Sequence, residues 1–382
     1  MCGMETAPTC MIADCQAPEI WLHQNCFPQT HRSVCMTLRI GILGCGKIAR
    51  HHAQGYKAAA DLSQVVVCCD EYNIELATNF AQDFGAYATG SWQAVIERDD
   101  VDAISICMPP HQHAPIALAA AVAGKHVLVE KPMALNLAEC REMVAAAKQA
   151  GTVLMVGQNQ RFQPEHVRIK QLLDRQAIGR VVALRFDCNQ FVKHMYPPDS
   201  WIFHRELSGG GMVAQTAVHK IDLMRHFFGE VDEVAAFNGH TGLNPNYKPG
   251  GNEDIAAFVM TFANGIIGEA FYLFAAYKVP IPTATGELTI FYGDEGILHN
   301  VQGWHIYSTK IPEYSGGMTK LDIPSYPYVD SVVAEIRHFL ECIRNGTEPL
   351  TSGRDNLGTM AVVEAIYQAA ETKTVVKVER RD

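Results

Sequence analysis

The sequence predicts an α/β Rossmann domain followed by an α+β domain with a largely antiparallel sheet. From residue 38 to residue 157, short β-branched runs alternate with helical patterns, which is typical of a parallel sheet buried between helices. After residue 157, apolar runs follow one another across short turns, which is typical of antiparallel strands. We therefore expect a first domain at 37–157 and a second domain at 158–382.

The expected strands of the first domain are Arg39–Leu43, Gln64–Cys69, Ala103–Cys107, His126–Val129 and Val153–Val156. Its clearest helix is Leu137–Ala150. Asn136 can cap the start of this helix, Glu139 occupies the capping-box position, and Gly151 ends it. These signals predict the helix from local chemistry alone.

The second domain is predicted to contain helices near Pro164–Arg175 and Asn356–Thr372, and a glycine-rich loop with a helix at Ser208–Phe228. Asn264-Gly265 is expected to form a hairpin turn. The expected strands are Arg180–Val192, Val231–Gly239, Asp254–Phe262, Ile266–Tyr277, Glu287–Tyr292, Ile297–Asn300 and Trp304–Ser308.

The turn after the first strand predicts the cofactor. Residues 44–49 read Gly44-Cys-Gly46-Lys47-Ile48-Ala49, and a strand feeding such a turn and then a helix can hold a pyrophosphate on free N–H groups. Asp70 ends the next strand, where an acid can bind the adenosine ribose hydroxyls. Glu71 follows it in place of an arginine for a 2′-phosphate, so we expect NAD, with NADP as the alternative. Asp70 could also simply end its strand in a turn.

Three further groups of residues could carry chemistry. Pro109 and His113 follow the third strand, where ligands of open α/β sheets lie. Glu130 and Lys131 follow the fourth strand, and an oxidised nicotinamide near Lys131 would disfavour its ammonium form. The third group is 209–222, where a helix would place Gln215, His219 and Asp222 on one face. Each of these groups alone also fits a structural role: a stiffened turn, a surface lysine or a core histidine.

Composition excludes several classes of protein. The 382-residue chain has 31 basic and 41 acidic residues and a net charge of -10, which argues against nucleic acid or an anionic membrane as the main partner. No apolar run is long enough to span a bilayer, and no histidine or cysteine spacing predicts a metal site. Residues 1–36 hold five of the 12 cysteines without a CxxC pair, and we expect a disordered extension there. Seven scattered cysteines favour a reducing, cytoplasmic location.

Taken in order, these motifs resemble the glucose–fructose oxidoreductase / inositol dehydrogenase (Gfo/Idh/MocA) family over nearly everything after Met36. The motifs are the 44–49 turn, Pro109 with His113, Glu130-Lys131-Pro132, Asn159-x-Arg161-Phe162, Trp201, the glycine run at 209–211, and His219-x-x-Asp222.

The resemblance implies a dinucleotide-binding domain at 37–157 and a substrate-binding and oligomerisation domain at 158–382, whose open-faced sheet often mediates oligomers, here a homodimer or homotetramer. It also implies a nicotinamide cofactor and a sugar, cyclitol or related polyol substrate. Lys131 would hydrogen-bond the reacting hydroxyl and His219 would exchange its proton. The resemblance also implies that Gln158 and Arg161 line the cofactor site. Arg161, Trp201 and Gln215 would join Lys131 and His219 around the substrate.

Gln215 departs from the family pattern, which has an aspartate four residues before the histidine. An amide cannot shuttle protons, but it can orient a substrate. The alternative function is redox-neutral glycoside cleavage with retained NAD, with which Gln215 is compatible although it does not argue for it. A non-catalytic cofactor-binding or regulatory protein is a third. The substrate is not specified by the sequence. Loops at 191–204 and 244–253, with Tyr196, Trp201, His204 and Tyr247, are expected to select it.

Overall fold

The computed structural model describes residues 37–190, 195–274, 286–324 and 326–380. The predicted extension at 1–36, the start of the 191–204 loop, and the predicted ends of the strands at Val192 and Tyr277 lie outside these residues. Residues 37–382 belong to one compact unit. No helix within the described ranges is long and apolar enough to cross a membrane.

The first sheet is parallel throughout and has the strand order β3-β2-β1-β4-β5-β6, that of a dinucleotide-binding Rossmann fold. Its strands are β1 (Leu38–Leu43), β2 (Ser63–Cys69), β3 (Tyr87–Thr89), β4 (Ala103–Ile106), β5 (His126–Val129) and β6 (Leu154–Val156). Its helices are α1 (Lys47–Ala58), α2 (Ile74–Gln82), α3 (Trp92–Ile96), α4 (His113–Val122) and α5 (Leu137–Ala150). The predicted parallel α/β domain is confirmed.

Local signals set the ends of α5 as expected. The Asn136 side chain accepts a hydrogen bond from the Glu139 N–H at 2.9 Å, and Glu139 Oε2 accepts one from the Leu135 N–H at 3.2 Å. Gly151 ends the helix in the left-handed conformation, with φ 68°.

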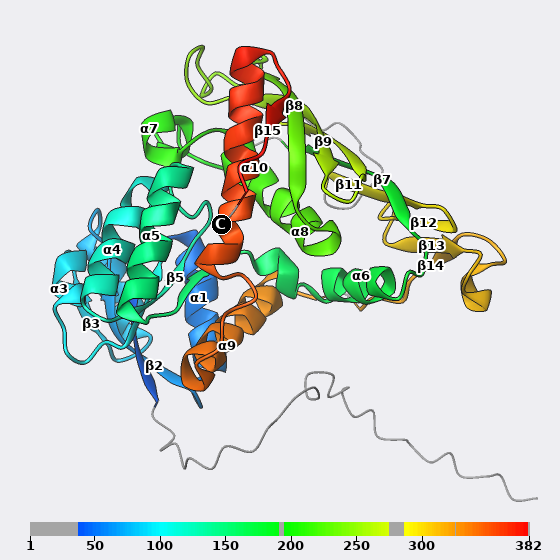
Figure 1. Ribbon diagram of the computed structural model, residues 1–382. Helices are drawn as coiled ribbons and strands as arrows, with labels where there is room; N and C mark the ends of the chain where they lie inside the picture. Colours follow the sequence, from blue (N-terminus) through cyan, green and yellow to red (C-terminus); the bar gives the residue numbers. More distant parts are fainter. Residues whose placement is uncertain (1–36, 191–194, 275–285, 325, 381–382) are drawn as a thin grey trace, which may run out of the picture. The chain divides into compact units, whose positions relative to one another are not determined.

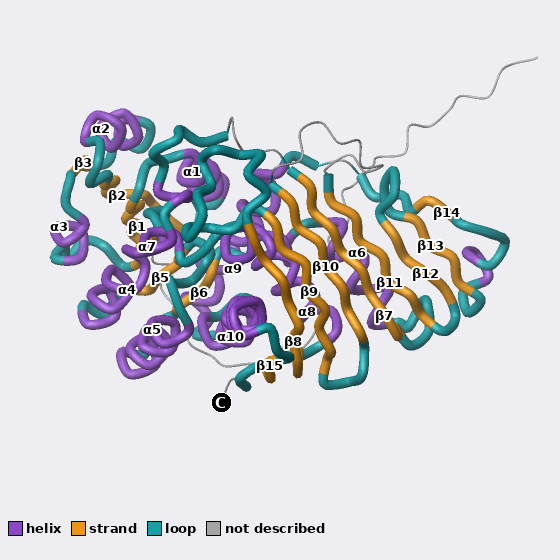
Figure 2. The backbone as a smooth tube through the Cα atoms, turned by 90° about the horizontal axis from the view of Figure 1, so that it is seen from above, coloured by secondary structure: helices purple, strands orange, loops and turns teal. Residues whose placement is uncertain are grey.

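The second sheet has nine strands in the order β14-β13-β12-β11-β7-β10-β9-β8-β15 and is antiparallel except where β7 pairs with β10 (Figures 1 and 2). Its strands are β7 (Val181–Asn189), β8 (Val231–Gly239), β9 (Ile255–Phe262), β10 (Ile267–Leu273), β11 (Glu287–Gly293), β12 (Gly296–His299), β13 (His305–Ser308), β14 (Thr319–Lys320) and β15 (Val376–Lys377). The predicted hairpin turn at Asn264-Gly265 joins β9 and β10, with Gly265 at φ 86°.

Helices cover one face of this sheet. They are α6 (Pro164–Asp174), α8 (Val218–Phe228) and α10 (Gly353–Thr372), and the short helix α7 (Arg205–Ser208) precedes α8. Along β9, Phe258 and Met260 are buried toward these helices, whereas Val259 is exposed on the other face. Phe237 and Ile267, exposed apolar residues on the neighbouring strands, lie opposite Ala257 and Thr261 and so continue this face, which no described helix covers.

A long helix that the sequence analysis did not predict, α9 (Tyr328–Asn345), returns to the first domain and packs on α1. Its buried residues Val332, Ile336 and Phe339 join Ile40 and Tyr56 in one apolar cluster. A Cβ atom at Gly55 would lie 2.5 Å from Ile336 Cδ1, so glycine lets the two helices approach closely. The C-terminal half of the chain therefore completes the core of the cofactor half.

Candidate active site

The glycine turn has the geometry expected for a dinucleotide. Gly44 has φ 86°, and a Cβ there would lie 2.6 Å from the Cys107 carbonyl oxygen, so only glycine fits. A Cβ at Gly46, in contrast, would meet nothing within 4 Å. Gly46 is the N-cap of α1 and supplies no side-chain cap, which leaves the N–H groups of the first helical turn directed into open space. These residues fit the diphosphate of a dinucleotide. Ala49 is buried beneath the turn, and Ile48 is half-buried.

Asp70 is fixed at the end of β2. One carboxylate oxygen accepts the Cys45 N–H at 3.0 Å, and the other accepts the N–H groups of Tyr72 and Asn73 at 3.1 and 2.9 Å. The carboxylate thus joins the glycine turn to the turn after β2. Glu71 lies beside it and accepts a hydrogen bond from Gln112 at 2.9 Å. Two acids at this position fit ribose hydroxyls and oppose a 2′-phosphate.

Lys131 follows β5 and reaches toward the start of α8. Its Nζ donates to the Gln215 carbonyl oxygen at 3.0 Å. Burial lowers the pKa of Lys131, while the neighbouring Glu130 carboxylate opposes that shift. The ammonium of Lys131 is thereby held in a site of low polarity with its proton more easily exchanged than that of a surface lysine.

A buried histidine that the sequence analysis did not single out supports Glu130. His52 of α1 contacts Glu130 Oε1 through Nε2 at 3.0 Å and the Ser105 hydroxyl through Nδ1 at 2.7 Å. Burial by itself raises the pKa of Glu130, but His52 and Lys131 outweigh it and bring the pKa below its usual range. The other oxygen of Glu130 accepts the Lys131 N–H at 3.2 Å, so this chain of contacts fixes the backbone at Lys131.

His219 lies in α8, with its Nδ1 2.9 Å from Gln158 Oε1. Because an amide oxygen only accepts, Nδ1 carries the proton and Nε2 keeps its lone pair. Burial, together with the charges of Lys131 and Lys220, holds the pKa of His219 well below its ordinary value. His219 is therefore a neutral base at pH 7. Gln158 Nε2, on the same amide, is buried without a partner among the described residues.

The segment before His219 differs from a regular helix. Residues Val213–Ala217 form a π-helical turn, so the chain between Gln215 and His219 is not the regular α-helix that the predicted common face assumed. The Gln215 amide donates to the Ser208 carbonyl oxygen at 2.6 Å, while its backbone oxygen holds Lys131. Asp222 points elsewhere, toward Arg161, so it does not pair with His219.

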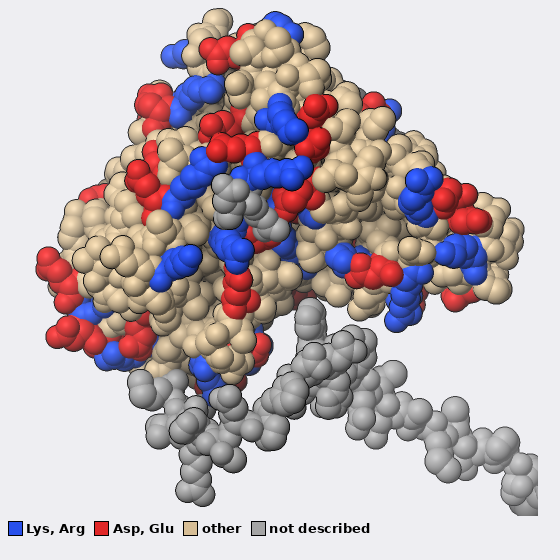
Figure 3. Space-filling model, in the orientation of Figure 1, with Lys and Arg blue, Asp and Glu red and all other residues tan. Residues whose placement is uncertain are grey.

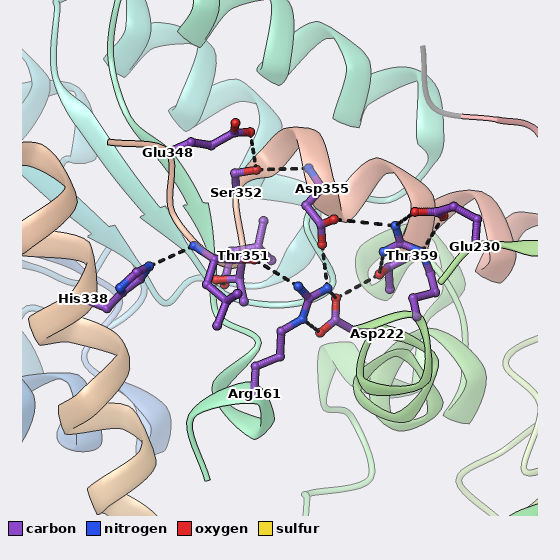
Figure 4. A network of polar contacts seen from close by, with 12 residues as sticks. Arg161, Asp222, Glu230, His338, Glu348, Thr351, Ser352, Asp355 and Thr359 are labelled. Atoms are coloured by element: carbon purple, nitrogen blue, oxygen red, sulfur yellow. Dashed lines mark hydrogen bonds and ion pairs between the residues drawn. The ribbon is translucent and has the colours of Figure 1, made fainter. Parts of the chain in front are cut away.

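Arg161 lies at the centre of a buried ion-pair network (Figure 4). Its Nε and Nη2 donate to the Asp222 carboxylate at 2.6 and 2.7 Å, Nη2 also donates to Asp355 at 2.6 Å, and Nη1 donates to the Leu350 carbonyl oxygen. These partners raise the pKa of Arg161 against the effect of burial. Its guanidinium joins the segment after β6 to α8 and α10, which favours a positioning role over the predicted direct contact with cofactor or substrate.

His113 is likewise enclosed by the protein. Its Nδ1 is 2.9 Å from the Pro132 carbonyl oxygen, and its Nε2 is 2.8 Å from that of Met108. Burial lowers the pKa of His113, although both carbonyl groups oppose this. It thus links the loop at Pro109 to the loop that carries Lys131. Trp201 is half-buried in the short helix Trp201–Phe203, on the predicted specificity loop.

Lys47 connects this loop to the glycine turn. Its Nζ donates to the Met195 carbonyl oxygen at 3.2 Å and lies 5.8 Å from the centre of the Tyr196 ring. The contacts of Lys47 and His52 join segments far apart in the chain, so motif reading could not locate them. The available signal for His52 was its position three residues after Ala49, in a helix that packs on the sheet.

The fold and these side chains define a dinucleotide-dependent oxidoreductase with a lysine and a histidine in one partly buried site. Residues 38–158 match the family model described as "Oxidoreductase family, NAD-binding Rossmann fold", and residues 170–378 match its "C-terminal alpha/beta domain". The chain belongs to the Gfo/Idh/MocA oxidoreductase family.

Its relatives include a D-apiose dehydrogenase of Paraburkholderia graminis, 30% identical over 87% of this chain and 88% of that protein. A myo-inositol 2-dehydrogenase of Thermotoga maritima is 26% identical over 90% of this chain and 99% of that protein. Among solved structures, a levoglucosan dehydrogenase in complex with NADH and levoglucosan is similar with a TM-score of 0.80, at 26% identity over 90% of this chain and all of that one.

Proposed function

We propose that this protein is an NAD-dependent dehydrogenase that oxidises a hydroxyl group of a sugar, cyclitol or related polyol, or reduces the corresponding ketone. The observation that carries the proposal is that Lys131 donates to the Gln215 backbone oxygen and that its charge, after burial, helps to lower the pKa of His219, so the two side chains share one partly buried site. Relatives with similar chains are dehydrogenases of D-apiose, myo-inositol and levoglucosan. Nothing in the comparisons supports the alternative of glycoside cleavage.

NAD would lie on the turn formed by Gly44, Gly46 and the start of α1, with its ribose hydroxyls on Asp70. When bound, the nicotinamide supplies the hydride acceptor. The Nε2 of Gln158 has no partner among the described residues, and it would donate a hydrogen bond to the bound cofactor or substrate.

The protein's own residues handle the proton. His219 Nε2 accepts the proton of the substrate hydroxyl, since Gln158 keeps the other ring nitrogen protonated. The Lys131 ammonium donates a hydrogen bond to the same oxygen and stabilises the negative charge that develops on it. His52 contacts Glu130, and Glu130 accepts the Lys131 N–H, so these two residues hold the backbone at Lys131 in place. In this proposal Gln215 orients Lys131 through its backbone oxygen, and His219 takes the proton without the family aspartate.

Substitution of the two central residues tests this proposal. Lys131→Met and His219→Asn should each lower kcat for the best substrate of a sugar and cyclitol panel by about 10²–10⁴-fold, the usual contribution of a positioned acid–base group. NAD binding, measured by calorimetry, should change little for His219→Asn. Turnover that survives both changes would contradict the proposed roles.

The uncovered face of the second sheet supports a homodimer or homotetramer, because exposed Phe237, Val259 and Ile267 form an apolar surface of the kind that subunits bury. All cysteines of the described residues are free, namely Cys45, Cys68, Cys69, Cys107, Cys140, Cys188 and Cys342. Free cysteines support the proposed cytoplasmic location.

A further inference from the structure

A cleft of about 570 Å³ lies at one end of the second sheet. Its lining comes from the start of α6, from the ends of β7 and β11, and from the chain between β14 and α9. The volume is within the range of pockets that hold small molecules. Among the described residues that line it, none is assigned above to the cofactor or to proton transfer.

The cleft lies near the reacting centre. Besides burial, the charge of Lys220, which lines the cleft, lowers the pKa of His219. Besides burial, the charge of Glu130, the residue before Lys131, raises the pKa of Tyr328, which also lines the cleft. Gln190 continues β7 toward the predicted specificity loop. On the other side, the Tyr328 ring lies edge-on to the His51 ring of α1, with 5.2 Å between centroids. We therefore expect a ligand that extends from His219 toward Lys220 and Tyr328 to enter this cleft.

The charges in the cleft are balanced. Lys220 Nζ contacts Glu287 Oε2 at 2.9 Å, and the Lys220 side chain is only 7% exposed. The other carboxylate, that of Glu165, accepts the Trp304 indole N–H at 3.2 Å, and Lys320 lies at the exposed rim. Burial and the charge of Lys220 hold the pKa of His166 well below its usual value, so its ring is neutral. Balanced charges favour a neutral ligand over a phosphate or a carboxylate.

The remaining groups suit hydroxyls. Gln160 Oε1 is buried and has no partner within the described parts of the chain. Gln163 adds a second amide, and Tyr326 and Tyr328 add aromatic rings. Amides and carboxylates bind the hydroxyl groups of a sugar ring, and aromatic faces cover its C–H surface.

We propose that this cleft is a subsite for a second sugar ring, so that the preferred substrate is a disaccharide or other glycoside rather than a free monosaccharide. This inference rests on the proposed dehydrogenase function. The ring to be oxidised lies at Lys131 and His219, and the linked ring lies between Gln160, Gln163 and Glu165.

Paired substrates test the subsite. NADH formation is measured with glucose, galactose, cellobiose, lactose and maltose, for the wild type, for Gln163→Ala in the cleft, and for Gln171→Ala, a matched control on α6 outside it. We expect at least one disaccharide to exceed its monosaccharide in kcat/KM. Gln163→Ala should lower that value about tenfold, as expected for a lost hydrogen bond, with the monosaccharide nearly unchanged. Equal losses for both sugars, or no preference for any disaccharide, would overturn the inference.

A binding measurement separates this inference from the proposed function. Saturation-transfer NMR with the NAD-loaded protein detects bound cellobiose, lactose or maltose whether or not turnover occurs. Binding that weakens in Gln163→Ala but not in Gln171→Ala supports the subsite even if no sugar is oxidised, which would count against the dehydrogenase function alone. Absence of disaccharide binding to the wild type would overturn the subsite.

Discussion

His219 and Lys131 share a partly buried site in which the positive charge of Lys131 disfavours a positive charge on His219. Burial depresses the pKa of both groups, and Lys220 adds a second cation beside His219. Because oxidation needs the neutral imidazole, activity should fall as the pH drops through the pKa of His219. That pKa lies well below the ordinary value, so the fall should come only at distinctly acidic pH.

Removal of the Lys220 charge should shift the acid limb of the pH profile of activity. Lys220→Met relieves the repulsion that disfavours protonated His219, so the acid limb of kcat/KM for oxidation should shift to higher pH by about half a unit to one unit. The measurement is a pH profile, with Lys148→Met on the surface of α5 as control and thermal melts to verify folding. An acid limb that stays in place would show that Lys220 does not tune the base.

Asp70 should set the choice of cofactor. Its carboxylate accepts the N–H groups of Cys45, Tyr72 and Asn73, and these hydrogen bonds are lost without it. The expected hydrogen bonds to the ribose hydroxyls are lost as well. Asp70→Ala should weaken NAD binding about ten- to hundredfold and reduce the preference over NADP. Titration calorimetry with both dinucleotides measures this, with Asp83→Ala as control. Unchanged affinities would remove Asp70 from the site.

At the scale of elements, the glycine turn and the caps of α5 were predictable because each depends on residues within a few positions. The helix α9 was missed although Val332, Ile336, Phe339 and Ile343 recur at helical spacing and Gly346 ends it with φ 62°. The π-helical turn before His219 has no comparable local signal. The partners of Arg161 and His52 lie 61 and 78 positions away, so no local pattern could indicate them.

The packing of α9 on α1 should contribute strongly to the stability of the cofactor half. Ile336 is fully buried against Gly55, and Ile336→Ala should lower the free energy of unfolding by about 2–5 kcal/mol through lost burial and a cavity. Urea denaturation measures this. Ala334→Ser, at a partly buried position of the same helix, serves as control. An effect no larger than that of the control would contradict the assigned role of α9.

At the scale of the whole molecule, two faces of the surface differ: one carries mixed charges and the other carries exposed apolar residues. Acidic and basic side chains are interspersed on the face shown in Figure 3, so this face presents no broad single-sign patch for a polyanion. The uncovered face of the second sheet is different, because Phe237 and Ile267 are 67% and 54% exposed there.

A charge on that face should disrupt assembly. Ile267→Lys should convert the proposed dimer or tetramer to smaller species, since an unpaired buried charge is costly at an interface. Light scattering after size exclusion gives the mass of the particle. Val122→Lys, on an exposed position of α4, is the matched control. A wild type that is monomeric would contradict the proposed oligomer directly.

The return of α9 to α1 also bears on how the protein is made. Translation delivers the Rossmann strands first, but the apolar surface of α1 around Tyr56 and Gly55 stays without its partner until residues 328–345 have left the ribosome. During that interval the nascent cofactor half exposes apolar surface, the condition under which chaperones engage growing chains. A late truncation that removes α9 would therefore damage the first half of the protein, far from the missing residues in sequence.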